Sequence, residues 1–355
     1  MRTVVWFDSA TEQERSCLGG KSISLGEMIS AGLPVPSGFS VTTQAFRLAR
    51  DGSASMPAIG ERLAGLDLAD PADVSARAAV VREIITGWPV PLAVEAEIRA
   101  SYQRLCELTA TSDVPVAVRS SATTEDSPDA SFAGEHDSYL WVCGADQVLH
   151  HIRRCWASLF TDRAVCYRAE LGYGQFEAEM CVAVQKMVRP KAAGVAFTLN
   201  PGNGDRSVVA IDSAWGFGEG VVSGAVTPDN FLVDKVLGSI SRRTVSAKSH
   251  AYLLNEDGQV RLTELAPEQA AAPSLSDAEI GAIARFARAA ERHYGCPQDV
   301  EWAVDADLPD GCNIVLLQAR PETVWSKKPV VVSTGADPVS SIVSTLINPL
   351  HARKP

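Results

Sequence analysis

The sequence predicts an α+β fold in which antiparallel sheets predominate. Segments with helical periodicity lie mainly in the first half of the 355-residue chain, and segments that alternate like strands lie mainly in the second half. A regular succession of strand, helix and strand is missing, so a parallel βαβ sheet is not expected. The length suggests two folding units, or one domain with two lobes.

The first half is expected to be mostly helical. A helix follows residue 20 and ends near Pro34, because apolar residues recur at helical spacing between these points. Residues 37–43 have the composition of a short strand, and residues 60–110 have helical periodicity. Residues 114–121 alternate as a strand does, which places Arg119 near the end of that strand.

A long loop and a strand-rich half follow. Residues 122–138 are small, polar and rich in turn formers, so we expect a loop. The clearest helix is 277–294, because Ser276 and Glu279 match a capping box and Gly295 is a stop signal. A further helix is expected at 145–172, and strands are expected at 180–188, 194–200, 207–214, 230–235, 239–245, 299–305 and 313–321.

The composition narrows the classes of function. It is 46% hydrophobic and 21% charged, which suits a folded protein with a substantial core. A formal net charge of −11, with no basic cluster, argues against nucleic acid or an anionic membrane as a partner. The eight cysteines form no C-x-x-C pair, and no segment reaches the roughly 18 apolar residues of a membrane span. We therefore expect a cytoplasmic protein with reduced thiols.

Two glycine-rich motifs are incomplete. Gly20-Lys21-Ser22 matches the end of the phosphate-binding P-loop, but the pattern requires glycine at position 15, which is Arg15. WGFGEG at 215–220 lacks the last glycine of the dinucleotide fingerprint, because Val221 stands there. A tight turn explains the second motif better, and Lys21 remains a candidate phosphate contact.

The last two expected strands carry a more informative constellation. Glu301 lies on the polar face of the first strand, and Gln318 and Arg320 are expected to share a face with Leu316 on the second. Antiparallel pairing would bring the three polar groups together. Carboxylate and amide oxygens suit Mg²⁺, and a guanidinium suits a phosphate. The alternative is that this face of the hairpin is simply solvated.

Arg119 and the loop after it form another candidate for anion binding. Backbone N–H groups at Ser131, Ala133 and Gly134 could fold over phosphates. The carboxylates of the same loop argue against a permanently bound anion. A plain surface charge is the alternative for Arg119, and a mobile lid or disorder is the alternative for the loop.

Five segments, taken in order, resemble the nucleotide-binding domain of the dikinase family, which includes phosphoenolpyruvate synthase, pyruvate phosphate dikinase and rifampicin phosphotransferase. They are GGKSISLGEMISAGLPVPSGFSVTTQAF, VAVRSSATTEDSPDASFAGEHDSY, VAVQKMVRPKAAGVAFTLNP, AWGFGEGVVSGAVTPDNF, and YGCPQDVEWAVD with IVLLQARPET. The resemblance implies an ATP-grasp-like fold with ATP and Mg²⁺ between two lobes, residues 1–190 and 191–328. Residues 329–355 would then be a linker or docking tail.

The resemblance also implies roles for single residues. Lys21, Arg119 and Arg320 would contact the ATP phosphates and act in catalysis, and Glu301 and Gln318 would bind Mg²⁺. The other residues implied to contact the nucleotide are Ser131, Phe132, Ala133 and Gly134 in the loop, and Gln185, Lys186, Met187 and Val188 in the strand beside adenine.

Members of this family use a histidine on a separate domain to accept the β-phosphoryl group of ATP, with AMP and phosphate as the other products. No histidine here lies in the corresponding T-S-H-A type of motif. The chain is therefore similar to the ATP-binding subunit of a split dikinase such as phenylphosphate synthase. This implies a phosphohistidine partner subunit and a small acceptor such as a phenolic compound or pyruvate. The alternatives are a stand-alone ATP-grasp kinase or ligase, a non-catalytic nucleotide sensor, and a fragment of a longer enzyme.

Overall fold

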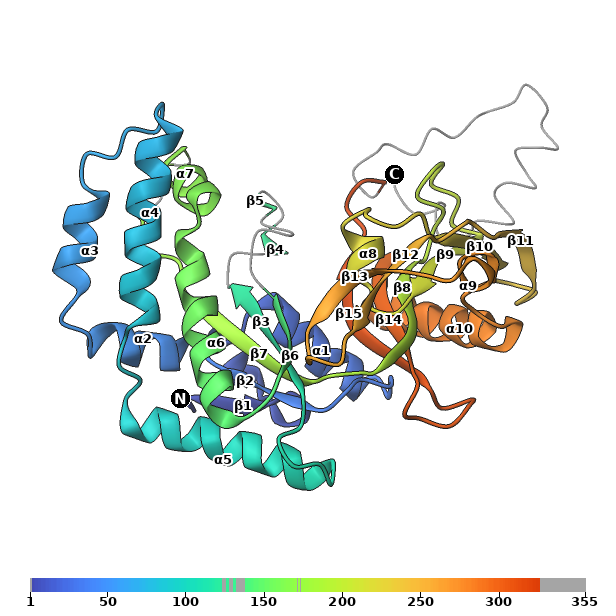
Figure 1. Cartoon of the computed structure of the whole chain (residues 1–355), viewed down its shortest axis with the longest axis horizontal. Helices are drawn as coiled ribbons and strands as arrows, with labels where there is room; N and C mark the ends of the chain where they lie inside the picture. Colours follow the sequence, from blue (N-terminus) through green and yellow to red (C-terminus); the bar gives the residue numbers. More distant parts are fainter. Residues whose placement is uncertain are drawn as a thin grey trace, which may run out of the picture. The chain divides into compact units, whose positions relative to one another are not determined.

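The computed structural model confirms the α+β class. It describes residues 2–122, 126–127, 130–131, 138–170, 172 and 174–325. The chain up to Pro321 forms one compact unit (Figure 1). In the second unit only residues 322–325 are described, where the Glu322 carboxylate accepts hydrogen bonds from the amides of Val324 and Trp325. Within the described ranges, no helix is both long and apolar enough to cross a bilayer.

The helices and strands have the following bounds. The helices are α1 Gly20–Ser30, α2 Thr43–Asp51, α3 Met56–Leu63, α4 Pro71–Thr86, α5 Leu92–Leu108, α6 Ala145–Ala157, α7 Asp162–Glu170, α8 Glu219–Val222, α9 Pro267–Ala271 and α10 Asp277–Tyr294, with 3-10 turns η1 Phe7–Ser9, η2 Glu12–Cys17 and η3 Ser158–Phe160. The strands are β1 Val4–Trp6, β2 Gly38–Val41, β3 Val116–Ala122, β4 Asp126–Ser127, β5 Ala130–Ser131, β6 Ser138–Val142, β7 Met180–Lys186, β8 Pro190–Phe197, β9 Val208–Trp215, β10 Asp229–Asp234, β11 Ile240–Thr244, β12 His250–Leu254, β13 Val260–Glu264, β14 Gln298–Asp305 and β15 Ile314–Pro321.

The first large sheet has the strand order β1-β2-β7-β3-β6, and its strand pairs are antiparallel. The helices α2, α4, α5 and α6 lie on one side of it (Figure 1). Val118 and Val184 face these helices and are fully buried with Trp156. Because side chains alternate along a strand, Ala117 and Arg119 point to the opposite face. That face lies toward the second sheet.

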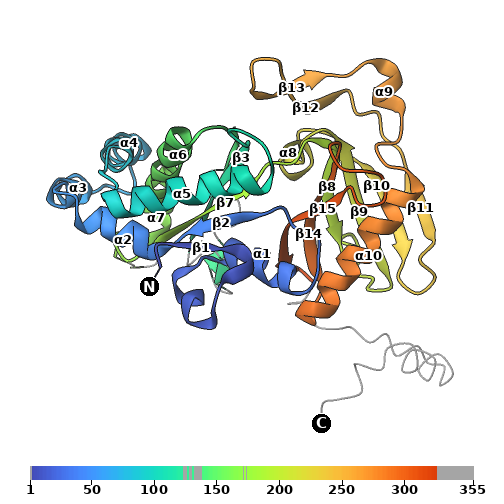
Figure 2. The ribbon, with the colours of Figure 1, turned by 90° about the horizontal axis from the view of Figure 1, so that it is seen from below.

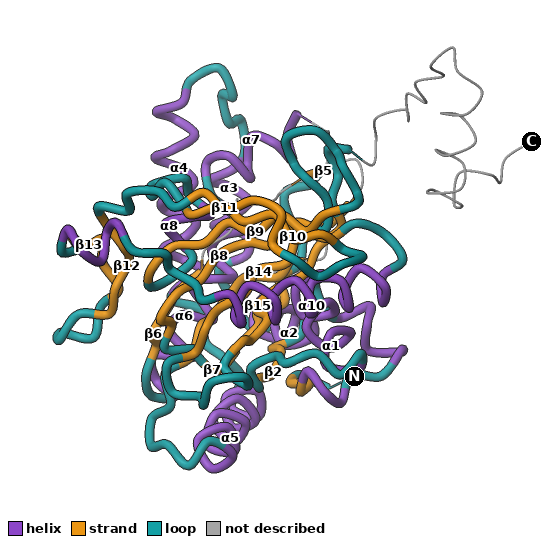
Figure 3. The backbone as a smooth tube through the Cα atoms, turned by 90° about the vertical axis from the view of Figure 1, so that its right-hand side faces the viewer, coloured by secondary structure: helices purple, strands orange, loops and turns teal. Residues whose placement is uncertain are grey.

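The second large sheet has the order β11-β10-β9-β8-β14-β15 and is also antiparallel. Helix α10 packs along one face of it, as Figures 2 and 3 show. Phe231, Trp302 and Ile283 are buried in the core between the helix and the sheet. The opposite face carries polar side chains in the same alternation, among them Glu301 and Asp212.

Helix α1 joins the two sheets. Its apolar residues Leu25 and Met28 belong to the core under α10, and the Ser24 hydroxyl donates to the Ala319 carbonyl at 2.7 Å. At its start, Gly19 lies directly against β3: an added Cβ would come within 1.8 Å of the Ser121 carbonyl oxygen. Only glycine therefore allows α1 to begin so close to the strand that carries Arg119.

A bulge in β15 overturns one predicted feature of the final hairpin. Trp302 pairs with Leu316, whereas the preceding residue Glu301 pairs with Gln318, so Leu317 is the extra residue. This insertion reverses the facing of the strand beyond it. Gln318 and Arg320 therefore lie together on the face opposite Leu316. The expectation that they share a face with Leu316 is wrong.

Most other expected elements of the described part are present. The helix at 277–294 is confirmed with its capping box and a left-handed Gly295. The predicted helix at 145–172 is instead broken into α6, η3 and α7, because Thr161 has extended backbone angles. Strands β1, β6, β12 and β13 were not predicted, nor were the two-residue strands β4 and β5 within the expected loop. The two-lobe division at residue 190 stays a prediction, and the proposed tail at 329–355 lies outside the described residues.

A buried ion pair holds the connection between β11 and β12. Lys248 and Asp229 are both fully buried, and Lys248 Nζ donates to Asp229 Oδ1 at 2.6 Å. The other carboxylate oxygen, Oδ2, accepts hydrogen bonds from the amide and the hydroxyl of Ser274 at 2.8 and 2.7 Å. The carboxylate thus ties β10 to two loops that are distant in sequence.

Removing the cation of this pair should strongly destabilise the fold. We expect Lys248→Met to lower the free energy of unfolding by about 3–5 kcal/mol, since it leaves the Asp229 charge buried without its counterion. The exposed pair Arg261–Asp257 serves as a control, and Asp257→Asn should change stability by less than about 1 kcal/mol. Urea denaturation measures both, and equal effects of the two substitutions would contradict the assignment.

Candidate active site

Arg119 connects the two sheets. One terminal nitrogen, Nη2, donates to Gln318 Oε1 at 2.8 Å and lies 3.4 Å from Glu301 Oε2. The other, Nη1, donates to the Leu317 carbonyl at 3.2 Å. The Arg119 and Glu301 side chains are only 14% and 21% exposed, so this ion pair is largely shielded from solvent. Three of the predicted site residues are thereby brought together from segments about two hundred positions apart.

Glu301 and Gln318 form a pair of oxygen acceptors, and the cation that they contact in this structure is the Arg119 guanidinium. They are direct cross-strand partners in β14 and β15, and both direct an oxygen at the Arg119 guanidinium. The donor set of one carboxylate and one amide oxygen fits a Mg²⁺ ion that keeps waters and substrate oxygens as its other ligands. Among the described residues, no group of three His, Cys, Asp or Glu side chains is arranged for a metal. The pair would therefore form part of a metal site rather than a complete protein cage.

Lys21 lies in the first turn of α1. Its Nζ donates to the Ser120 carbonyl at 3.0 Å, so the ammonium lies beside the strand residue that follows Arg119. The Ser22 amide also donates to Ser121 Oγ at 3.3 Å, which fixes the start of the helix on β3. Two of the three cations predicted to contact phosphate, Lys21 and Arg119, therefore flank the same end of β3.

Arg320 lies on the same face as Gln318, two residues further along β15. Its Nε is 4.0 Å from Asp299 Oδ2, and its side chain is 41% exposed, so the guanidinium is held loosely. Asp299 was not predicted as a site residue. The alternation that selected Glu301 could have found it, because Asp299 is two residues earlier in the same strand.

The segment 185–188 runs from the first sheet to the second. Gln185 is buried, and its amide donates to the Pro36 carbonyl at 3.3 Å. Lys186 Nζ lies 4.0 Å from the buried Asp305 carboxylate. The Met187 amide donates to the Pro115 carbonyl at 2.8 Å. These contacts place the segment beside the beginning of β3, away from the Arg119 end.

Val188 begins an apolar cluster on the second sheet. It packs with Ala193, Ala303, Val315 and Leu317, on the face that also carries Glu301. Along β14, the surface that faces the site thus changes from apolar at Ala303 to charged at Glu301, two residues away.

The predicted phosphate-covering loop falls largely outside the described part of the chain. Phe132, Ala133 and Gly134 are not described, and the backbone of Ser131 pairs with that of Asp126 in the small sheet β4–β5. The roles predicted for these four residues stay predictions.

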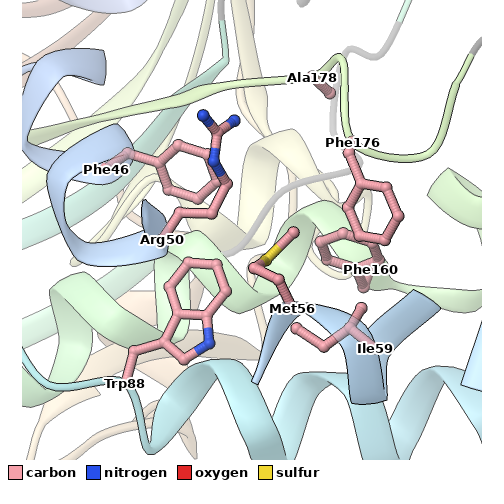
Figure 4. Close-up of a pocket in the computed structure, with 8 residues that line it drawn as sticks. All are labelled: Phe46, Arg50, Met56, Ile59, Trp88, Phe160, Phe176 and Ala178. Atoms are coloured by element: carbon pink, nitrogen blue, oxygen red, sulfur yellow. The ribbon is translucent and has the colours of Figure 1, made fainter. Parts of the chain in front are cut away.

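A pocket in the helical layer does not fit a triphosphate. Figure 4 shows Met56 surrounded by aromatic rings, with the Arg50 guanidinium at one side. The lining residues are Phe46, Arg50, Met56, Ile59, Trp88, Phe160, Phe176 and Ala178. Several of them belong to the core on the helix-covered face of the first sheet, whereas Arg119 points from the other face. This hollow is therefore separate from the polar constellation.

Comparison with known proteins identifies the domain. Residues 15–338 match the pyruvate phosphate dikinase AMP/ATP-binding domain. A probable phosphoenolpyruvate synthase of Staphylothermus marinus is 41% identical over 347 residues, which cover 92% of this chain and 42% of that protein. A probable phosphoenolpyruvate synthase of Methanothermobacter thermautotrophicus is 40% identical, with 95% and 50% covered. The phosphoenolpyruvate synthase of Aeropyrum pernix is 38% identical, with 92% and 43% covered.

The chain therefore spans about half or less of the length of these relatives. The resemblance seen in the sequence is confirmed at the level of the ATP-binding domain, and the specific likeness to phenylphosphate synthase stays a prediction. Since the family match covers most of the residues, this chain belongs to the family of pyruvate phosphate dikinase AMP/ATP-binding domains.

Proposed function

We propose that this chain binds ATP and supplies its β-phosphoryl group to a histidine on a separate partner subunit. AMP keeps the α-phosphate, the γ-phosphate is released as phosphate, and one water is consumed. The observation that carries the proposal is the convergence of Arg119 with Glu301 and Gln318 from two sheets. The family match to an AMP/ATP-binding domain is the reason for proposing ATP as the nucleotide.

The proposed catalytic role of the chain is to bind and neutralise a triphosphate. Lys21 and Arg119 flank one end of β3, and Arg320 projects from β15 on the face of Gln318. Preorganised cations lower the free energy of a phosphoryl-transfer transition state because they need little rearrangement as charge develops. Arg119 is held by three acceptors, whereas the more exposed Arg320 has freedom to follow a moving phosphate.

Glu301 and Gln318 are the residues we propose to hold Mg²⁺. Bound there, the metal would neutralise charge on the phosphate oxygens. Arg119 already donates to both oxygens, so a metal ion must share them with the guanidinium or displace it. The same two side chains would then respond to both the metal and the arginine.

The phosphoryl acceptor is proposed to lie outside this sequence. The curated relatives extend well beyond the matched region, and none of the six histidines here lies in the expected motif. Because the relatives are named phosphoenolpyruvate synthases, pyruvate is the first final acceptor to test, and a phenolic compound is the second. The relatives' name alone supports this choice of acceptor.

Substitution of the site residues should reduce turnover without unfolding the protein. We expect Lys21→Ala and Glu301→Gln each to lower ATP-dependent phosphoryl transfer by about 10²–10³-fold, because each removes a preorganised charge. Initial rates of AMP formation in the presence of the partner measure the effect, and circular dichroism checks the fold. Lys191→Ala and Glu256→Gln, matched changes outside the constellation, should retain near-normal rates; a similar rate for Lys21→Ala would refute its role.

The competition between Arg119 and a metal can be measured directly. Arg119→Ala frees both oxygens, so Mn²⁺ without nucleotide should bind at least about tenfold more tightly, equivalent to roughly 1.4 kcal/mol. Turnover should fall in the same variant because a phosphate contact is lost. Electron paramagnetic resonance titration gives the Mn²⁺ affinity. The double variant with Glu301→Gln should lose the gain, and a gain that persists would place the metal elsewhere.

Isotope transfer tests the proposed function as a whole. Incubation of the chain with β-³²P-labelled ATP and the product of the neighbouring gene should place an acid-labile label on a histidine of that partner. The γ-³²P-labelled nucleotide should yield labelled phosphate instead. Candidate acceptors added afterwards should remove the label from the histidine.

The outcomes of this experiment separate the alternatives. Turnover by the chain alone with a small molecule would favour a stand-alone kinase or ligase. Nucleotide binding with no label on any protein would favour a sensor. Either result would overturn the proposed transfer to a partner.

A further inference from the structure

The edge strand β6 contains a bulge that redirects a tryptophan. Val116 of β3 pairs with Val142 and Val118 pairs with Tyr139, so the single residue Ala117 lies opposite both Leu140 and Trp141. Trp141 has a φ of 58°, in the left-handed region, which is rare for a bulky side chain. Bulges and unusual backbone angles of this kind often aim a side chain at a functional surface.

The bulge turns Trp141 toward the face that carries Arg119. Val142 and Tyr139 pair with core-facing residues of β3, and the two residues between them share the row of Ala117. On the other side of β3, Ala117 pairs with Gln185. Trp141 and Gln185 thus lie on opposite sides of Ala117. Their strands, β6 and β7, are two strand spacings apart, about 10 Å. Ala117 contributes only a methyl group between them.

Trp141 is held in place by the segment that follows β9. Its ring packs edge-to-face on Phe217, with centroids 6.2 Å apart and an interplanar angle of 89°. Phe217 is itself fixed, because its amide donates to the Tyr252 carbonyl at 2.9 Å and it is 7% exposed. Gly216 permits this contact, since a Cβ there would lie 2.2 Å from the same carbonyl oxygen. The WGFGEG segment is thereby a support for the tryptophan.

Both sheets change from apolar to charged in the same direction. On β3, Ala117 precedes Arg119 by two residues, about 7 Å along the strand. On β14, Ala303 lies in the apolar cluster, two residues from Glu301. The hydrogen bond from Arg119 to Gln318 aligns the charged ends. A nucleotide has an apolar base at one end and a triphosphate at the other, so its base belongs at the end that carries Trp141.

We propose that Trp141, supported by Phe217, is the side chain that contacts the base of the bound nucleotide and makes the site select a nucleotide over a bare polyphosphate. This inference rests on the proposed ATP-binding function. The tryptophan faces the segment 185–188 across Ala117, and stacking on an aromatic base is favourable for any π-face. The phosphate contacts of Arg119 and Lys21 are independent of it.

The test compares two ligands that contain the base, ATP and AMP, with tripolyphosphate, which has no base. Trp141→Asn removes the ring and retains a residue that tolerates the left-handed conformation. We expect it to weaken binding of ATP and of AMP by roughly 5- to 100-fold and to leave binding of Mg²⁺-tripolyphosphate within about twofold, because only the base contact is lost. Isothermal titration calorimetry of the whole chain measures all three ligands.

Two further variants sharpen the comparison. Trp141→Phe keeps an aromatic ring and should restore most of the affinity for ATP. Trp6→Ala disrupts a different aromatic pair on the same sheet, the tilted pair of Trp6 with Phe39, and should leave binding of all three ligands unchanged. In the unaltered chain, ATP should quench tryptophan fluorescence and tripolyphosphate should not. The quenching by ATP should diminish in Trp141→Phe.

The outcomes distinguish this inference from the proposed function. If the unaltered chain binds neither ATP nor tripolyphosphate, the proposed function fails. If it binds both and Trp141→Asn weakens both equally, the tryptophan acts as a structural support, and our inference is overturned. Unchanged ATP affinity in Trp141→Asn would overturn it as well.

Discussion

The hydrogen bonds of Arg119 are the contact on which the organisation of the site depends. They join β3 to β15 through the Leu317 carbonyl and the Gln318 amide oxygen, and to β14 through the Glu301 carboxylate. The bulge at Leu317 makes this possible because it turns Gln318 to the same face as Glu301. In a regular strand Gln318 would lie on the opposite face.

The two faces of the second sheet differ in polarity: one is apolar and buried under α10, and the other carries charged side chains. The face under α10 buries Trp302 and Phe231 and contributes hydrophobic stabilisation of roughly 1.5–3 kcal/mol for each large apolar side chain. The other face carries carboxylates, among them Glu301 and Asp212. Burial raises the pKa of Asp212 there, and a hydrogen bond from Asn230 at 2.7 Å opposes the rise. In a protein with net charge −11, the cations that we propose to bind phosphate are positioned individually and do not form an overall positive field.

The sequence predicted those features that arise from local periodicity. The helix at 277–294 follows from its capping signals, and the antiparallel hairpin that brings Glu301 near Gln318 follows from strand alternation. The bulge at Leu317 was missed because a single added residue leaves the hydrophobic pattern nearly unchanged. Strand β6 was missed because its residues carry no strong alternation. The meeting of Arg119 with the final hairpin has no local signal at all and came from family resemblance.

The backbone of Trp141 gives a reason to look beyond stability for its role. A left-handed conformation costs roughly 1–2 kcal/mol for a residue with a Cβ, and an edge-to-face aromatic pair returns about 0.5–1.5 kcal/mol. The two terms nearly cancel, so the contact with Phe217 alone offers the fold little net gain. Asparagine would fit the same backbone with less strain. A large ring at such a position is explained more readily by a ligand that stacks on it than by packing, since the bound base would add the missing stabilisation.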